Sequence, residues 1–312
     1  MKRYDVAGWH LASAFALPGL PETGGHGPID IEIISGDVPA WPDGNVVVDH
    51  LVFSVGRDGT VMMTIAGLLR ILIADGRRVT VHTLVEQEDA SIGMLLRGPV
   101  LAVLARQRGL LPFQASAIRH GDGAVALLGP AGCGKSVLTA LLARGGPEIL
   151  SDGLCLIAAG PDGATIRPLS PALRLWRDAW TALGLDDAKV AACRPDRGYG
   201  FVTPHPAAAT PPSSTVPLRA IVFVRARGEM PDEELTDGPR PVEALARLSL
   251  TLAARPALVA GPLARHLGGQ LAGVAASARL LAARSAESWE EAERLADGIL
   301  DRLGNDGGGI WQ

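Results

Sequence analysis

The chain has 312 residues, of which 47 % are hydrophobic, enough for one large domain or two ordinary ones with a substantial core. Its net charge of -4 and pI near 6.0 do not provide the basic surface that nucleic acids or anionic membranes attract, so neither is expected as a partner. Three widely spaced cysteines indicate neither a disulfide framework nor a zinc cluster, which favours a reducing cytoplasm.

The first hundred residues have the pattern of short β-strands. Residues 30–34 alternate between polar and apolar side chains, and the runs 46–55 and 61–65 flank an Asp58-Gly59 pair, which is a hairpin signal. Residues 91–109 then space apolar side chains three and four apart, which predicts a helix with Ser91 as N-cap and Gly109 at its end. We therefore expect a β-rich N-terminal region from residue 1 to about 108.

A strand, a helix and a second strand are predicted next. Residues 124–128 form a short apolar run, residues 135–144 have helical spacing, and residues 148–151 resume the apolar run after a Gly-Gly-Pro break. We expect them to form a compact βαβ unit of an α/β domain that covers residues 109–303.

Beyond this unit, a proline-rich stretch precedes alanine-rich helices. Residues 194–217 are a candidate lid or substrate loop, although a mobile linker fits equally well. A strand is predicted at 218–224 and helices at 241–254, 261–275 and 288–303. The tail, 304–312, is predicted to be flexible.

The segment between the predicted strand and helix matches G-x-x-x-x-G-K-[ST] at every fixed position, in the context that this phosphate-binding motif requires. Its glycines let backbone N–H groups turn toward phosphate oxygens, and the helix N-terminus adds partial positive charge. Lys135 would contact the β- and γ-phosphates of ATP, and the Ser136 hydroxyl would bind Mg²⁺. The predicted cofactor-binding residues are Gly129, Pro130, Ala131, Gly132, Cys133, Gly134, Lys135, Ser136 and Val137.

The alternative is a glycine-rich turn that matches the motif by chance, because the chain contains 38 glycines. The lysine argues against it. The only lysines are Lys2, Lys135 and Lys189, so a chance match at that position is on the order of one in a hundred. The abundant arginines cannot replace its compact charge.

Asp152 is predicted to reach the same site. The helix from Lys135 runs about 15 Å away from the loop, and a strand of four or five residues brings the chain back. If the connection is a right-handed parallel crossover, Asp152 ends its strand beside the loop. A carboxylate there can bind Mg²⁺ or accept a proton from an attacking hydroxyl. An aspartate that only caps the turn 151–153 is the structural alternative.

Residues 111–157 resemble the catalytic domain of HPr kinase/phosphorylase and its bacterial relatives. The likeness rests on the 129–136 motif and, at matching spacing, on the segments Phe113-Gln114-Ala115-Ser116-Ala117, Gly121-Asp122-Gly123 and Leu150-Ser151-Asp152-Gly153. Weaker likeness at 4–21, 173–176 and 216–218 extends it over most of the chain. The resemblance implies that the domain has the HPr-kinase-like P-loop fold. Within the family, the chain most resembles a branch of small kinases that phosphorylate a peptide serine in lasso-peptide biosynthesis.

Two residues depart from the family pattern. Gln114 stands where many members carry a histidine, and an amide does not titrate. Gly153 stands where a second aspartate usually lies, which removes a possible Mg²⁺ ligand or catalytic carboxylate.

A phosphotransferase also needs a cation facing the transferring phosphoryl group. Arg174 is the first candidate for that role, ahead of Arg177, Arg194 and Arg197, and a solvated arginine is the alternative.

We therefore expect an ATP- and Mg²⁺-dependent kinase that transfers the γ-phosphoryl group to a serine hydroxyl of a peptide or small protein. Its catalytic residues would be Asp152, Lys135, Arg174 and Gln114, with Ser136 and Asp152 as metal ligands. The N-terminal region and residues 194–217 would form the acceptor groove. A nucleotide-binding regulatory module and a small-metabolite kinase stay open as alternatives. The acceptor, the choice between ATP and GTP, and the oligomeric state are also open.

Overall fold

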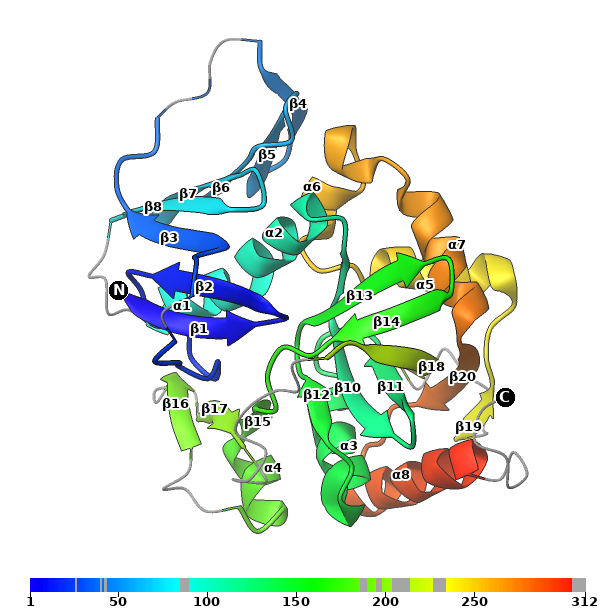
Figure 1. Cartoon of the computed structure of the whole chain (residues 1–312). Helices are drawn as coiled ribbons and strands as arrows, with labels where there is room; N and C mark the ends of the chain where they lie inside the picture. Colours follow the sequence, from blue (N-terminus) through cyan, green and yellow to red (C-terminus); the bar gives the residue numbers. More distant parts are fainter. Residues whose placement is uncertain are drawn as a thin grey trace.

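Figure 1 shows the computed structural model, which describes residues 1–25, 27–39, 41, 44–84, 90–185, 190–194, 198–203, 214–226 and 234–304. Two large β-sheets, each covered by helices, and one small sheet make up the described chain. The fold is therefore mixed α/β, as predicted.

The first sheet contains eight strands in the order β1-β2-β3-β8-β7-β6-β5-β4. The predicted hairpin at Asp58-Gly59 is confirmed, because β5 and β6 pair antiparallel around it and Gly59 adopts a φ of +85°. The run predicted at 46–55 is two strands with a turn between them. The strands are β1 (Lys2–Val6), β2 (Trp9–Ser13), β3 (Ile31–Ser35), β4 (Val46–Asp49), β5 (Phe53–Gly56), β6 (Val61–Ile65), β7 (Leu69–Ala74) and β8 (Arg78–Thr83).

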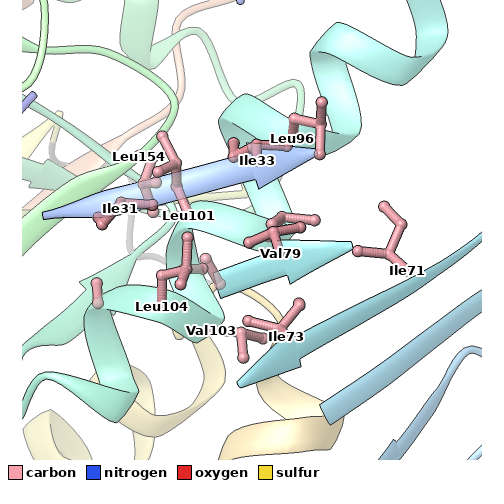
Figure 2. Packing of buried hydrophobic residues seen from close by; sticks show 14 of the residues in the cluster. Ile31, Ile33, Ile71, Ile73, Val79, Leu96, Leu101, Val103, Leu104 and Leu154 are labelled. Atoms are coloured by element: carbon pink, nitrogen blue, oxygen red, sulfur yellow. The ribbon is translucent and has the colours of Figure 1, made fainter. Parts of the chain in front are cut away.

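A helical segment covers this sheet. The helix predicted over 91–109 is found as α1 (Ala90–Leu95), η1 (Leu96–Val100) and α2 (Leu101–Gln107). The predicted N-cap is wrong, because Ser91 lies inside the first turn of α1. The middle piece is a π-helix that contains Pro99, whose ring has no N–H to donate to the helix ladder. Figure 2 shows the apolar side chains of β3, β7 and β8 packed against Leu96, Leu101 and Leu104, together with Leu154 from the second half of the chain.

The second sheet contains nine strands and is organised around the long strand β18. The first residues of β18 pair with β14, and its later residues lie between β11 and β20, parallel to both. The strands are β9 (Leu111–Phe113), β10 (Ala115–His120), β11 (Gly123–Leu128), β12 (Ile149–Ser151), β13 (Cys155–Gly160), β14 (Gly163–Arg167), β18 (Val216–Arg225), β19 (Leu235–Asp237) and β20 (Arg279–Arg284).

Alternating side chains of β11 give the second sheet two apolar faces. Val125 and Leu127 pack with α3 (Lys135–Leu142) and α8 (Trp289–Gly304), whereas Ala126 and Leu128 pack with α5 (Pro241–Leu250) and α7 (Leu267–Ser277). Shorter helical turns are η2 (Ala143–Gly145), α6 (Arg255–Leu258) and η7 (Gly261–Ala264). The helices predicted from residue 241 onward are confirmed, with breaks at 251–254 and 265–266.

A third, small sheet includes Arg174, one of the predicted catalytic residues. It consists of β15 (Leu173–Trp176), β17 (Tyr199–Val202) and β16 (Val190–Arg194), and α4 (Arg177–Ala182) continues directly from β15. Only part of the proline-rich stretch belongs to this sheet. Residues 195–197 and 204–213, and the tail from 305 to 312, lie outside the described residues.

The predicted βαβ unit needs one correction. Strands β11 and β12 flank α3 as expected, but they are not neighbours, because β10 lies between them and pairs antiparallel with both. Two antiparallel pairings make β11 and β12 parallel to each other. Their carboxyl ends therefore reach the same edge of the sheet, and Asp152 still arrives beside the start of α3.

Candidate active site

The glycine-rich loop, residues 129–134, connects the end of β11 to the start of α3. At Gly129 the backbone lies so close to β18 that a β-carbon would be 2.4 Å from the carbonyl oxygen of Val224. Gly132 and Gly134 both have a φ of +83°, a conformation that costs other residues strain. The loop conformation thus depends on glycine at the positions where the sequence places it.

Lys135 folds back over this loop. Its Nζ donates hydrogen bonds to the carbonyl oxygens of Gly129 at 2.8 Å and Pro130 at 2.7 Å, and lies 3.6 Å from Cys133 Sγ. The ammonium group is thereby held against the first two residues of the glycine-rich loop.

Asp152 is a buried carboxylate with three donors around it. Its side chain belongs to a residue that is only 1 % exposed, directly after β12. Oδ1 accepts hydrogen bonds from Ser116 Oγ at 2.5 Å and from Ser136 Oγ at 2.8 Å. Oδ2 accepts one from the backbone N–H of Arg174 at 2.7 Å. A buried charge of this kind is tolerated because its oxygens are satisfied, and its position is fixed by β10, β15 and α3 together.

Ser116 was not among the predicted site residues. It is fully buried in β10, the strand inserted between β11 and β12, and its hydroxyl points to Asp152. Gln114 precedes β10 and is exposed, so strand alternation does not pair it with Ser116. The available signal was the segment 113–117, which carries the family resemblance and contains Ser116.

One cavity of about 790 Å³ joins the predicted catalytic residues, and we call it the Asp152 cavity. Its lining includes Lys135 and Ser136 of α3 together with Asp152. The first sheet and the helix over it also contribute to the lining, through Val52, Phe53, Met63, Ile65, Leu95 and Pro99. Gln114 and Arg174 also line this cavity, as do Ala131, Gly132, Gly134 and Val137.

Arg174 and Gln114 contribute differently from Asp152. In β15 the side chains of Arg174 and Trp176 face outward, whereas Leu173 and Leu175 are buried. Trp176 is 58 % exposed and makes an edge-to-face contact with Tyr199, with ring centroids 5.1 Å apart. Gln114 is exposed, and its backbone N–H donates to the carbonyl oxygen of Thr251 at 2.7 Å. Both polar side chains are thus free of the core and border the cavity.

The donor set next to the loop suits Mg²⁺. Ser136 Oγ and the two oxygens of Asp152 are separated by 2.8 and 3.0 Å. Adjacent ligands of an octahedral Mg²⁺, each about 2.0–2.1 Å from the ion, lie about 3 Å apart, and the ion prefers oxygen donors. Gly153 also lines the Asp152 cavity, and a β-carbon added there would meet no atom within 4 Å. Its φ of +79° favours glycine at this position.

Comparisons with known proteins provide little more. No protein-family model matches the chain, and no curated protein matches it. Among solved structures, the HPr(Ser) kinase/phosphatase from Coxiella burnetii is similar, with 15 % sequence identity and a TM-score of 0.23. The match covers 38 % of this chain and 69 % of the Coxiella chain. Such a likeness carries no argument about function. The described helices include none that is both long and apolar enough to span a membrane.

Proposed function

We propose that this chain is an ATP- and Mg²⁺-dependent phosphotransferase that acts on a hydroxyl group. The observation that carries the proposal is the convergence of Lys135, Ser136 and buried Asp152 on one cavity beside the glycine-rich loop. The loop offers backbone N–H groups at a helix N-terminus, where phosphate oxygens are favoured. The same cavity leaves room for an acceptor next to those phosphates.

In the proposed reaction, the acceptor oxygen forms a bond to the γ-phosphorus while the bond from that phosphorus to the β–γ bridging oxygen breaks. ADP leaves with that oxygen, and the acceptor proton passes to Asp152. Lys135 turns from the carbonyl groups of Gly129 and Pro130 to the phosphates. Mg²⁺ held by Ser136 and Asp152 would neutralise charge on the phosphate oxygens.

The hydrogen bonds of Asp152 explain how it can be both held and reactive. Ser116 and the backbone N–H of Arg174 come from β10 and β15 and fix the carboxylate. Ser136 lies at the half-buried start of α3, and its hydroxyl can rotate away from Asp152. That rotation frees a lone pair of the carboxylate on the cavity side.

As acceptor we propose a serine of a peptide or small protein in the cytoplasm, with a lasso-peptide precursor as the first candidate. The first sheet supplies an apolar wall of the Asp152 cavity, and the exposed side chains of Trp176 and Leu250 line its mouth. Apolar peptide side chains on either side of the serine would contact these surfaces, and their burial would exclude water from the γ-phosphoryl group.

The test is to incubate the enzyme with Mg-ATP and precursor peptides encoded beside its gene, and to measure peptide mass. We expect one phosphoryl group on a serine, and a transfer rate about 10²- to 10⁴-fold lower for Asp152→Asn. Asp162→Asn is the matched control, because Asp162 is exposed in the turn between β13 and β14 and does not line the Asp152 cavity. Nucleotide binding without transfer would favour a regulatory module, and phosphate on a metabolite would favour the small-metabolite kinase.

A further inference from the structure

A second cavity, of about 370 Å³, adjoins the same loop and lies away from Asp152. Gly134 and Val137 line both cavities, so the first turn of α3 borders each of them. Its walls are mainly apolar and include Leu138 of α3, Ala182 of α4, Val224 of β18, and Ala292 and Leu295 of α8. Its volume falls within the roughly 300–1,000 Å³ typical of small-ligand pockets. We call it the Trp289 cavity.

The ring of Trp289 is held in place before any ligand arrives. Its Nε1 donates to Glu293 Oε1 at 2.9 Å, and Arg144 binds the same carboxylate oxygen at 2.6 Å. The Arg144 guanidinium also lies 5.5 Å from the centre of the indole ring. An indole fixed by a hydrogen bond and a cation offers a flat surface whose ordering cost is already met by the fold.

The small side chains at the cavity leave space beside this ring. Ala182, Ala286 and Ala292 line the cavity at positions where larger residues would fill it. The space therefore suits a flat, largely apolar group, and stacking on an aromatic side chain is the usual way in which proteins bind nucleobases.

We infer that the Trp289 cavity binds a purine base, so that a nucleoside triphosphate lies across the start of α3 with its base at Trp289 and its terminal phosphate in the Asp152 cavity. This inference rests on the proposed function. Its direction follows from the side chains, because Lys135, Ser136 and Asp152 all line the other cavity. Stacking of a purine is expected to add roughly 10- to 100-fold to affinity over that of the phosphates alone.

The experiment is calorimetric titration of the whole protein in the presence of Mg²⁺ with two probes, the non-hydrolysable ATP analogue AMPPNP and inorganic tripolyphosphate. The Ala182→Phe variant fills the cavity from an exposed position at the end of α4, and Ala286→Leu fills it from a second side. Ala272→Phe, at an exposed position of α7 away from both cavities, is the matched control.

We expect each filling variant to weaken AMPPNP binding at least tenfold and to leave tripolyphosphate binding within about twofold of wild type. The control should change neither, and uridine triphosphate should bind wild type more weakly than AMPPNP because a pyrimidine stacks over less area. Equal losses for both probes, no loss for either, or equal affinity for the uridine nucleotide would overturn the inference. Lys135→Ala separates the two claims, because unchanged tripolyphosphate binding in that variant would refute the proposed function itself.

Discussion

At the scale of single residues, the proposed transfer depends on how Asp152 is held. A carboxylate that is 1 % exposed needs hydrogen-bond donors to remain in the core, and Ser116, Ser136 and the backbone of Arg174 supply them. Two side chains donate hydrogen bonds to Asp152. Ser116 is fully buried, whereas Ser136 lines the cavity. We therefore assign Ser116 the role of a positioning residue for Asp152.

The variant Ser116→Ala tests that role. It removes a hydrogen bond to a charged group, so we expect the free energy of unfolding in urea to fall by about 1.5–3 kcal/mol. The kcat for transfer should fall roughly tenfold while the KM for ATP stays close to wild type, because the glycine-rich loop, which we propose as the phosphate site, is untouched.

Ser170→Ala provides the comparison for Ser116→Ala. Ser170 is also fully buried, and its hydroxyl donates to the carbonyl oxygen of Gly19 at 2.5 Å, away from Asp152. Its replacement should lower stability and leave kcat unchanged. Equal effects of the two variants on kcat would show that Ser116 acts only through the stability of the fold.

At the scale of elements, the strand–loop–helix around residues 124–142 was predictable, because its apolar periodicity and its glycines are local signals. The position of β10 between β11 and β12 was not. A strand's neighbours depend on contacts made by residues far apart in sequence, and both arrangements bring Asp152 to the same edge. The predicted proximity of Ser136 and Asp152 is therefore found, at 2.8 Å, although β11 and β12 are not neighbours in the sheet.

Strand β20 escaped prediction for a different reason. Its sequence Arg279-Leu-Leu-Ala-Ala-Arg follows the alanine-rich helix α7, and leucine and alanine favour helices. Parallel pairing with β18 overrides that preference, because Leu281, Ala282 and Ala283 of β20 are buried in the second sheet.

Gly129→Ala tests the loop as an element. A β-carbon at this position would lie 2.4 Å from the carbonyl oxygen of Val224, so the loop must move away from β18. We expect the affinity for Mg-AMPPNP to fall by tenfold or more, because the N–H groups of the loop lose their common direction. Gly121→Ala, in the turn between β10 and β11, is the comparison, because its β-carbon meets open space and its cost is limited to about 1–3 kcal/mol of backbone strain away from the loop. Unchanged affinity in Gly129→Ala would show that the loop does not bind phosphate in this conformation.

At the scale of the whole molecule, the two large sheets share a core. The apolar cluster under the first sheet includes Leu154, Leu156 and Leu169 from the second half of the chain, and Leu258 from α6. Leu154 also lines the Asp152 cavity, so the packing that joins the halves also shapes that cavity. The first sheet therefore helps to shape the Asp152 cavity by packing against Leu154, in addition to any contact with an acceptor.

Alkaline pH should destabilise the whole fold through Cys155, which is fully buried in β13. Burial raises the pKa of the Cys155 thiol to about 12 from an ordinary value of 9.0. The unfolded chain ionises first, so the stabilising effect of the buried thiol is complete below about pH 9 and is lost as the pH rises to about 12.

Urea unfolding of wild type and Cys155→Ala at several pH values measures this effect. The variant loses a constant amount of stability from the small cavity that it creates. Wild type should lose on the order of 2 kcal/mol more than the variant between about pH 9 and pH 10.5. If the difference in free energy of unfolding between wild type and the variant does not change with pH, the raised pKa of the Cys155 thiol would be contradicted.

The most direct test of the central claim is a crystal structure of the protein with Mg²⁺ and AMPPNP. We expect the phosphates to lie against the backbone N–H groups of the glycine-rich loop, with Lys135 released from the carbonyl oxygens of Gly129 and Pro130. Mg²⁺ should lie about 2.0–2.1 Å from oxygens of Ser136 and Asp152. Phosphates bound elsewhere, or Asp152 still closed on Ser136 with no metal beside it, would contradict the account.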